Sequence, residues 1–281
     1  ELAALFPPEI YQDTSRQLVA LQTLHDDFLE LHCTLAADYG CYLVAASFPV
    51  RLTDGSYRNR AYFCRPDGTW DFQDKLIMTR FEAEVWSIAP GDAIKVFWTP
   101  FGRVGINICY DSEFPHIAHS QVANGADLIL VPSCTDTMAG YHRVRTGSRA
   151  RALENQCYVV TAPVVGTVDW SDAIDVNLGA AGVFTPIDRG FPDDGILTEG
   201  ALHRPQWLFT TLDLAELERI RREGQVYNYR DWAYQFGHAI DVEPAPNWLL
   251  PALMTGVIHA ARQERAEEAM PPRDHLLARR K

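Results

Sequence analysis

The chain has 281 residues, of which 47% are hydrophobic and 22% charged, so it can bury a large core and is not a disordered chain. Its formal net charge of −12 excludes a nucleic acid or an anionic membrane surface as a favoured partner, because both would repel it. No apolar stretch approaches the roughly 20 residues needed to cross a bilayer, so we expect no membrane contact.

Six cysteines are scattered along the chain without CxxC spacing: Cys33, Cys41, Cys64, Cys109, Cys134 and Cys157. A disulfide framework or a zinc site would show clustering, so we expect reduced thiols in a cytoplasmic protein. Neither HExxH, a P-loop nor GxGxxG is present, and we expect no metal and no cofactor.

Leucines recur at helical spacing behind Asp13 or Thr14 as the N-cap, which predicts one helix over 13–39 that ends at Gly40. Apolar runs bounded by turn residues predict the strands 41–48, 59–64, 72–75, 94–100, 103–109, 126–131, 157–165, 181–185 and 207–212. Further helices are predicted at 114–124, 139–155 and 213–223. Because several strands follow one another as hairpins between helices, we expect an α/β protein whose sheets pack together under outer helices.

The composition changes near residue 226, where aromatic residues and prolines become frequent. We therefore expect one domain over residues 1–225. Residues 226–281 are expected to form a C-terminal arm that contacts another subunit and ends in a flexible tail.

Cys109 ends the apolar run GINIC and is followed by a polar segment and a helix. A thiol at such a strand-to-helix elbow is held for attack, and the positive end of the following helix favours the thiolate. The alternative is a buried cysteine with no chemical role. A Cys–His pair is a weaker alternative, because His116, His119 and His142 have no distinctive spacing.

Only three of the 25 basic residues are lysines, namely Lys75, Lys95 and Lys281. A chain that uses arginine almost everywhere else has little compositional reason to place a lysine at position 75. Chance is one explanation. The other is that a compact ammonium, rather than a planar guanidinium, is required there.

Four strings stand in one order along the chain: DFQDKLIMTRFEAEVW, GINICYDSEFP, GADLILVPSCTDT and RARALENQCYVV. In this order and spacing they resemble the carbon–nitrogen hydrolase (nitrilase) superfamily over roughly residues 40–225. The resemblance is closest to a bacterial branch described only as carbon–nitrogen hydrolases. It implies a four-layer αββα sandwich and a Glu–Lys–Cys triad.

By this resemblance, Cys109 matches the nucleophile and Lys75 matches the lysine that stabilises the oxyanion. Glu82 matches a second carboxylate that many members carry, although it could instead be a helix-start residue with no role. The backbone N–H of Tyr110 is the expected second oxyanion donor. Attack by the thiolate on an amide or nitrile would give a thioester on Cys109 and release ammonia or an amine.

The triad glutamate of this family follows a strand within a Pro-Glu dipeptide. Pro8-Glu9 is the only such dipeptide ahead of the first long helix, and no strand precedes it. We therefore expect the family's first two strands, its first helix and its catalytic glutamate to lie upstream of residue 1.

Four more residues are candidates for the substrate pocket: Trp86, Ser133, Thr135 and His142. Ser133 and Thr135 follow a predicted strand where family members line the pocket, but a loop role is an equal alternative. Trp86 could be a pocket wall or a core residue.

The leading hypothesis is thiol-dependent hydrolysis of a small-molecule amide, favoured over a nitrile. Its alternatives are a catalytically silent scaffold with the same fold and a Cys-dependent N-acyltransferase. The resemblance also implies a homodimer or a higher homo-oligomer.

Overall fold

The computed structural model describes residues 2–171 and 176–238, and residues up to Tyr234 form one compact unit. Its N-terminal helices are η1 (Leu2–Leu5), α1 (Pro8–Tyr11), α2 (Thr14–Leu21), η2 (Gln22–Leu24) and α3 (His25–Asp38). The part of the predicted arm over 239–281 lies outside the described residues. Between Val226 and that boundary the chain forms α8 (Asn228–Asp231) and η4 (Trp232–Gln235).

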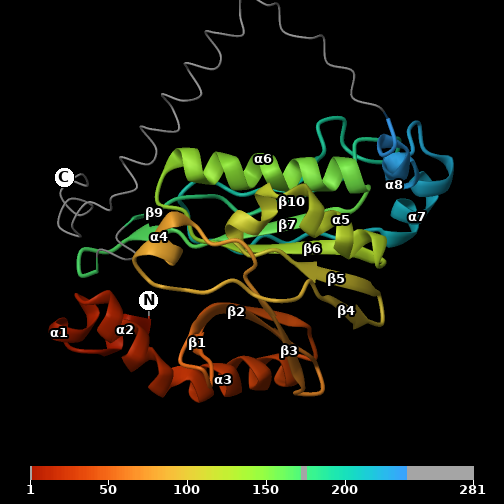
Figure 1. Cartoon of the computed structure of the whole chain (residues 1–281). Helices are drawn as coiled ribbons and strands as arrows, with labels where there is room; N and C mark the ends of the chain where they lie inside the picture. The colour runs from red at the N-terminus through yellow and green to blue at the C-terminus, as the bar shows by residue number, and fades with distance from the viewer. Residues whose placement is uncertain (1, 172–175, 239–281) are drawn as a thin grey trace, which may run out of the picture. The chain divides into compact units, whose positions relative to one another are not determined.

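The larger sheet has six strands in the order β11-β10-β7-β6-β5-β4. They are β4 (Val96–Thr99), β5 (Gly102–Ile106), β6 (Ala126–Ser133), β7 (Tyr158–Pro163), β10 (Gly182–Phe184) and β11 (Ile196–Glu199). The β5, β6 and β7 ladder is parallel, and the remaining pairs are antiparallel. The parallel strands are joined through α5 (Pro115–Ala123) and α6 (Met138–Asn155), which cover one face of this sheet (Figure 1).

The smaller sheet is an antiparallel meander of β1 (Leu43–Arg51), β2 (Tyr57–Cys64) and β3 (Trp70–Asp74). Its strand β2 alternates between two environments, as the pleat of a strand requires. Ala61 and Phe63 join the core shared with the larger sheet, whereas Tyr62 and Cys64 pack with residues of α3. The order of layers is therefore helices, six-stranded sheet, three-stranded sheet and helix (Figure 1).

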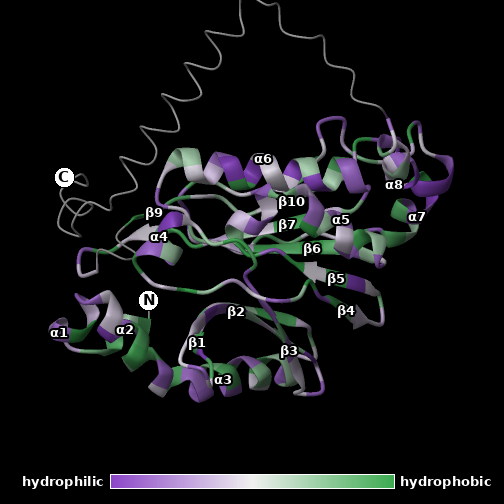
Figure 2. Ribbon diagram, in the orientation of Figure 1, coloured by the Kyte–Doolittle hydropathy of each residue, from purple (hydrophilic) through white to green (hydrophobic). Residues whose placement is uncertain are grey.

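Stacked aromatic rings help to join the two sheets. The rings of Phe63 in β2 and Phe97 in β4 lie 4.8 Å apart at an interplanar angle of 19°. Figure 2 shows β6 as strongly hydrophobic along its length, while α6 carries many hydrophilic residues. The predicted α/β sandwich with outer helices is thus the fold that forms.

The predicted helix over 13–39 is interrupted. Asp13 caps α2, as expected, by accepting hydrogen bonds from the backbone of Ser15 and Arg16. The break at η2 coincides with Gln22, whose side chain donates to the carbonyl of Pro49 and accepts from the N–H of Arg51. These bonds fasten the turn to β1, a long-range contact that helical periodicity does not report.

The prediction of a strand at 207–212 is wrong, since these residues belong to no strand. Trp207 and Phe209 are 86% and 83% exposed. Alternating apolar residues predict that a segment can be extended, but a strand also needs a hydrogen-bonded neighbour. The predicted helix at 213–223 is confirmed as α7 (Leu214–Glu223), and the remaining short elements are α4 (Arg80–Glu84), β8 (Gly166–Thr167) and β9 (Val176–Asn177).

Candidate active site

Cys109 is the first residue of the 3₁₀ turn η3 (Cys109–Glu113), which follows β5 after two residues. Its φ of +51° is in the left-handed region that non-glycine residues rarely adopt, and such strain persists only where the surroundings hold it. The hydroxyl of Ser112 donates to the carbonyl of Cys109 at 2.7 Å and so closes the turn. The predicted elbow is present, and the thiol reaches the carbonyl of Cys134 at 3.6 Å.

Helix α6 packs directly behind this elbow. A Cβ atom at Gly147 would lie 2.8 Å from the carbonyl oxygen of Ser112 and 3.2 Å from the Cα of Glu113. Contacts that short to backbone atoms cannot be relieved by moving a side chain. Glycine at this position therefore lets α6 support the turn that carries Cys109.

Lys75 follows β3 of the smaller sheet, and its side chain is only 2% exposed. Its backbone is held on both sides, since its N–H donates to Asn59 at 2.8 Å and its carbonyl accepts from Gly91 at 2.7 Å. The ammonium is bound to the carboxylate of Glu82, whose side chain is 8% exposed. The structure thus brings together two residues that stand seven positions apart.

Glu82 is the third residue of α4, where it completes a capping box with Thr79. Its carboxylate accepts hydrogen bonds from the backbone and hydroxyl of Thr79 and from the amide of Asn59, all between 2.8 and 2.9 Å. Burial alone would raise the pKa of Glu82. The ammonium of Lys75 and these hydrogen bonds outweigh it, so the pKa is lowered and Glu82 is a carboxylate.

The electrostatics at the thiol differ from the sequence prediction. Burial raises the pKa of Cys109, so the elbow by itself does not favour the thiolate. The positive charge of Lys75 and the backbone N–H of Tyr110 act in the opposite direction, and the charge of Glu82 adds to the rise. A five-residue 3₁₀ turn is too short to supply a strong helix dipole, which leaves Lys75 as the main stabiliser of a thiolate.

Asp111 is a site residue that the sequence did not single out. It is 1% exposed and its carboxylate accepts backbone N–H groups from Leu76, Ile77 and Ile108. Burial raises its pKa to about 6 in spite of these bonds. The sequence offered one signal for it, an acidic residue two positions after the candidate nucleophile. An acidic residue in such a polar turn is more often exposed to solvent, so it did not stand out.

The pocket candidates separate into three locations. Ser133 and Thr135 are buried and line one small cavity with Tyr141 and Arg145, where the hydroxyl of Thr135 donates to the carbonyl of Leu178. Trp86 packs its ring 5.4 Å from that of Phe81, and its buried indole N–H has no hydrogen-bond partner among the described residues. His142 lies on α6 and is exposed. Ser133 and Thr135 thus line a common cavity.

Pro8 and Glu9 open the short helix α1 and are exposed. The carbonyl of Glu9 accepts a hydrogen bond from Arg16, within the N-terminal helices. Among the described residues, the 3₁₀ helix η1 precedes the dipeptide, and no strand does.

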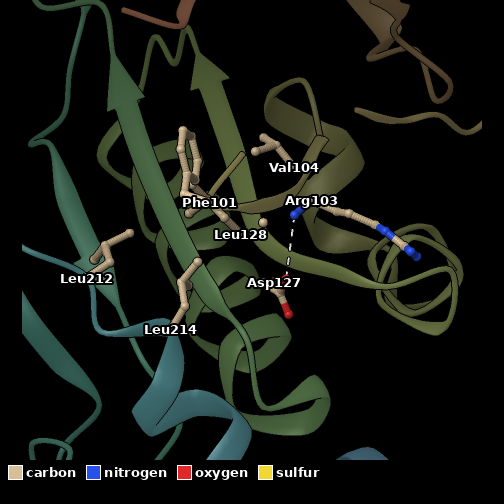
Figure 3. Close-up of a pocket in the computed structure, with 8 residues that line it drawn as sticks. Phe101, Arg103, Val104, Asp127, Leu128, Leu212 and Leu214 are labelled. Atoms are coloured by element: carbon tan, nitrogen blue, oxygen red, sulfur yellow. Dashed lines mark hydrogen bonds between the residues drawn. The ribbon is translucent and has the colours of Figure 1, made fainter. Parts of the chain in front are cut away.

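A larger cavity of about 150 Å³ lies at the other end of the parallel strands, near Phe101 and Val104 of the β4–β5 region and Leu128 of β6 (Figure 3). Leu212 and Leu214, which come later in the chain, also line it (Figure 3). Cys109 lies three residues beyond Ile106, the last residue of β5, whereas this cavity is lined by residues at the start of β5 and β6. The two features are therefore separate.

Metal ligation has no support in the part of the chain that the structure describes, where no three His, Cys, Asp or Glu side chains are grouped to hold an ion. All six cysteines are free thiols. The described helices include none long and apolar enough to span a membrane.

Solved structures of carbon–nitrogen hydrolases share this fold. One is the carbon–nitrogen hydrolase from Helicobacter pylori G27, with a TM-score of 0.68 and 20% identity over 82% of this chain and 81% of that one. The fold and the elbow cysteine beside a buried lysine define a nitrilase-type α/β sandwich. The family model described as carbon-nitrogen hydrolase matches residues 6–192, and the chain belongs to that family.

Two curated relatives illustrate its place in the family. The probable hydrolase YhcX of Bacillus subtilis (strain 168) is 37% identical over 206 residues, which are 73% of this chain and 40% of that protein. The human omega-amidase NIT2 is 28% identical over 206 residues, or 70% of each chain. The chain spans about half or less of the length of several of the relatives it matches, such as the Xenopus laevis omega-amidase NIT2-B at 51%.

Proposed function

We propose that the protein hydrolyses a non-peptide carbon–nitrogen bond, an amide in preference to a nitrile, through a thioester on Cys109. The observation that carries this proposal is the buried ammonium of Lys75, whose charge acts on a thiol held at a strained elbow. Omega-amidases among the relatives favour an amide, and terminal carboxamides are therefore the first substrates to try.

In this reaction the thiolate of Cys109 attacks the carbonyl carbon, and the oxygen of the substrate becomes negatively charged. The ammonium of Lys75 and the backbone N–H of Tyr110 both act at the sulfur, so they are placed to stabilise that charge as well. Collapse of the tetrahedral species releases ammonia or an amine, and water then cleaves the thioester.

Glu82 suits a different role from that of the proton acceptor. Its carboxylate is occupied by Lys75, Thr79 and Asn59, and a lowered pKa makes it a weak base. We assign it to holding the ammonium of Lys75 in place. By the family resemblance, the general base is a different glutamate, the one of the Glu–Lys–Cys triad.

The test is ammonia release from a panel of terminal amides and nitriles, with Cys109→Ala as the matched inactive variant. We expect release from at least one amide, and a hydroxamate when hydroxylamine replaces water as the acceptor. Release that persists in Cys109→Ala would contradict the proposal. A folded protein that forms no adduct and releases no ammonia would support a silent scaffold, and transfer to amines without hydrolysis would support an acyltransferase.

We further propose a cytoplasmic, homo-oligomeric protein. Six free thiols are compatible with a reducing compartment. The exposed, stacked rings of Trp207 and Phe209 offer apolar surface of the kind that subunit contacts cover. Sedimentation equilibrium would report the subunit number, and a monomer at all concentrations would exclude the oligomer.

A further inference from the structure

One buried carboxylate connects the two halves of the site. Asp111 accepts the N–H of Ile77 at 2.8 Å through Oδ1 and that of Ile108 at 3.2 Å through Oδ2. Both of its oxygens lie 3.2 Å from the N–H of Leu76. All three donors are backbone groups, so the contacts fix the course of the chain and not the position of a flexible side chain.

The three donors are sequence neighbours of Lys75 and Cys109. Leu76 and Ile77 are the two residues that follow Lys75, and Ile108 is the residue that precedes Cys109. Lys75 directly follows β3 of the smaller sheet, whereas Cys109 lies shortly after β5 of the larger one. Asp111 therefore ties together the two segments that carry the ammonium and the thiol.

Burial of this carboxylate has an energetic cost. Desolvation raises the pKa of Asp111 to about 6, although three N–H groups and the charge of Lys75 act to lower it. No ion-pair partner touches Asp111 among the described residues. Groups kept in an unfavourable ionisation environment are concentrated at functional sites, which is a reason to look for a role beyond local folding.

We infer that Asp111 is a positioning residue that holds the backbone of Lys75 against the Cys109 elbow, so that the ammonium stays close to the sulfur. The inference rests on the proposed function, because it assigns Asp111 to the same site. Asp111 does not touch the reacting atoms. It acts through the position of Lys75.

The chain offers a matched control in Asp188. This carboxylate is also buried, and it also accepts backbone N–H groups, those of Arg189, Gln225 and Val226. None of these three residues belongs to the site or stands next to Lys75 or Cys109 in the sequence. Asp111→Asn and Asp188→Asn therefore make the same chemical change to the same kind of contact, once at the site and once away from it.

The experiment is the rate at which iodoacetamide alkylates Cys109, followed by peptide mass mapping across a range of pH. In Asp111→Asn the ammonium is displaced, so we expect the pH midpoint of alkylation to rise and the rate at pH 7 to fall about tenfold. Turnover, where measurable, should lose about 100-fold in kcat with little change in KM. Asp188→Asn should alkylate like the wild-type protein.

A double-mutant cycle separates positioning from general loosening of the fold. In a Lys75→Met/Glu82→Gln background the ammonium is gone, and Asp111→Asn should then change the alkylation rate less than about twofold. An equal slowing in both backgrounds would show a merely structural role and overturn the inference. Wild-type alkylation in a folded Asp111→Asn protein would overturn it as well.

If Asp111→Asn does not fold, Asp111→Glu keeps the acceptor oxygens and displaces them by about one bond length. It should show a smaller rise of the same midpoint, and an unchanged midpoint would contradict the inference. Alkylation requires no turnover, so its outcome is independent of the amide panel. If no amide is hydrolysed, but Asp111→Asn still slows alkylation only when Lys75 is present, the proposed function is rejected and the positioning role of Asp111 is kept.

Discussion

The two halves of the site are held by different physical means. Cys109 is held by backbone conformation and close packing: a left-handed φ, a hydrogen bond from Ser112 to its carbonyl, and the approach of α6 at Gly147. Lys75 is held by charge and hydrogen bonds, through Glu82 and Asn59. The Cys109 side should therefore respond to changes of volume, and the Lys75 side to changes of charge.

This difference also explains why the site needs both sheets. Burial raises the pKa of Cys109, so a well-packed elbow alone carries an unreactive thiol. The ammonium that counters this effect comes from the end of β3, on the other sheet. Packing of the two sheets, through contacts such as those of Phe63 with Phe97, is thus a condition for the proposed chemistry.

The largest effect is expected from Lys75→Met. It leaves the carboxylate of Glu82 buried without its cation, which should lower the free energy of unfolding by about 3–5 kcal/mol and abolish turnover. Lys75→Met/Glu82→Gln should recover most of the stability and none of the activity. Chemical denaturation measures both variants.

The exposed pair Arg80–Glu84 provides the control for that experiment, since it is an ion pair four residues apart on the same short helix. Arg80→Met should leave both unfolding and activity near the wild-type values. A double variant no more stable than Lys75→Met would contradict the account of the buried pair.

Two carboxylates should give opposite dependences of stability on pH. The folded pKa of Glu82 is lowered, so its contribution is present at neutral pH and is lost as the pH falls through that value. The pKa of Asp111 is raised to about 6, so the protein loses stability as the pH rises from about 4 through 6. Asp111→Asn should remove that loss, about 2–3 kcal/mol between pH 4 and pH 7.

Thermal or denaturant unfolding across pH 3–8 would measure both dependences. Glu82→Gln should flatten the acid limb of the wild-type curve, and Asp111→Asn the limb between pH 4 and pH 6. Parallel curves for the wild-type protein and Asp111→Asn would show that the pKa of Asp111 is the same in the folded and the unfolded protein, which would contradict its rise on burial.

Gly147→Ala tests the packing on the Cys109 side. The added methyl group meets the backbone of Ser112 and Glu113, so α6 must shift, at about 1–3 kcal/mol of stability. Alanine's better helix propensity returns about 1 kcal/mol at most. Alkylation of Cys109 should also slow, because its turn moves.

Gly200→Ala is the control substitution, because the atoms nearest to the new Cβ belong to the end of the flexible Gln206 side chain. We expect it to change neither unfolding nor alkylation measurably. If Gly147→Ala behaves in the same way, α6 does not support the elbow as described.

The smallest effect is expected from Cys134→Ser. Cys134 meets Cys109 through its backbone carbonyl, and its own thiol donates to Asn177 at 3.0 Å. A hydroxyl can make the same donation, so turnover should stay within about threefold of wild type. Peptide mapping should still find alkylation at Cys109, and its loss would point to a direct role for the second thiol.

The sequence predicted the turn at Cys109 from a local pattern, an apolar run followed by a polar segment and a helix. It singled out Lys75 through the scarcity of lysine and the family resemblance. It did not reveal that Asp111 contacts Leu76, since that bond joins residues 35 positions apart. Nor could it give the pKa of Cys109, which depends on the whole of its surroundings. The prediction of a strand at 207–212 was wrong for a related reason. A strand forms only when a second segment pairs with it, and one segment's own sequence does not show whether such a partner exists.

The central claim is that Cys109 carries an acyl group during the reaction and that Lys75 supports its formation. Intact-mass analysis of the acid-quenched protein, after mixing with an amide that it hydrolyses, tests this most directly. The account predicts a mass increase equal to the acyl group, mapped to Cys109, absent in Cys109→Ala and strongly reduced in Lys75→Met/Glu82→Gln. Ammonia release without any adduct, and undiminished in Cys109→Ala, would contradict it.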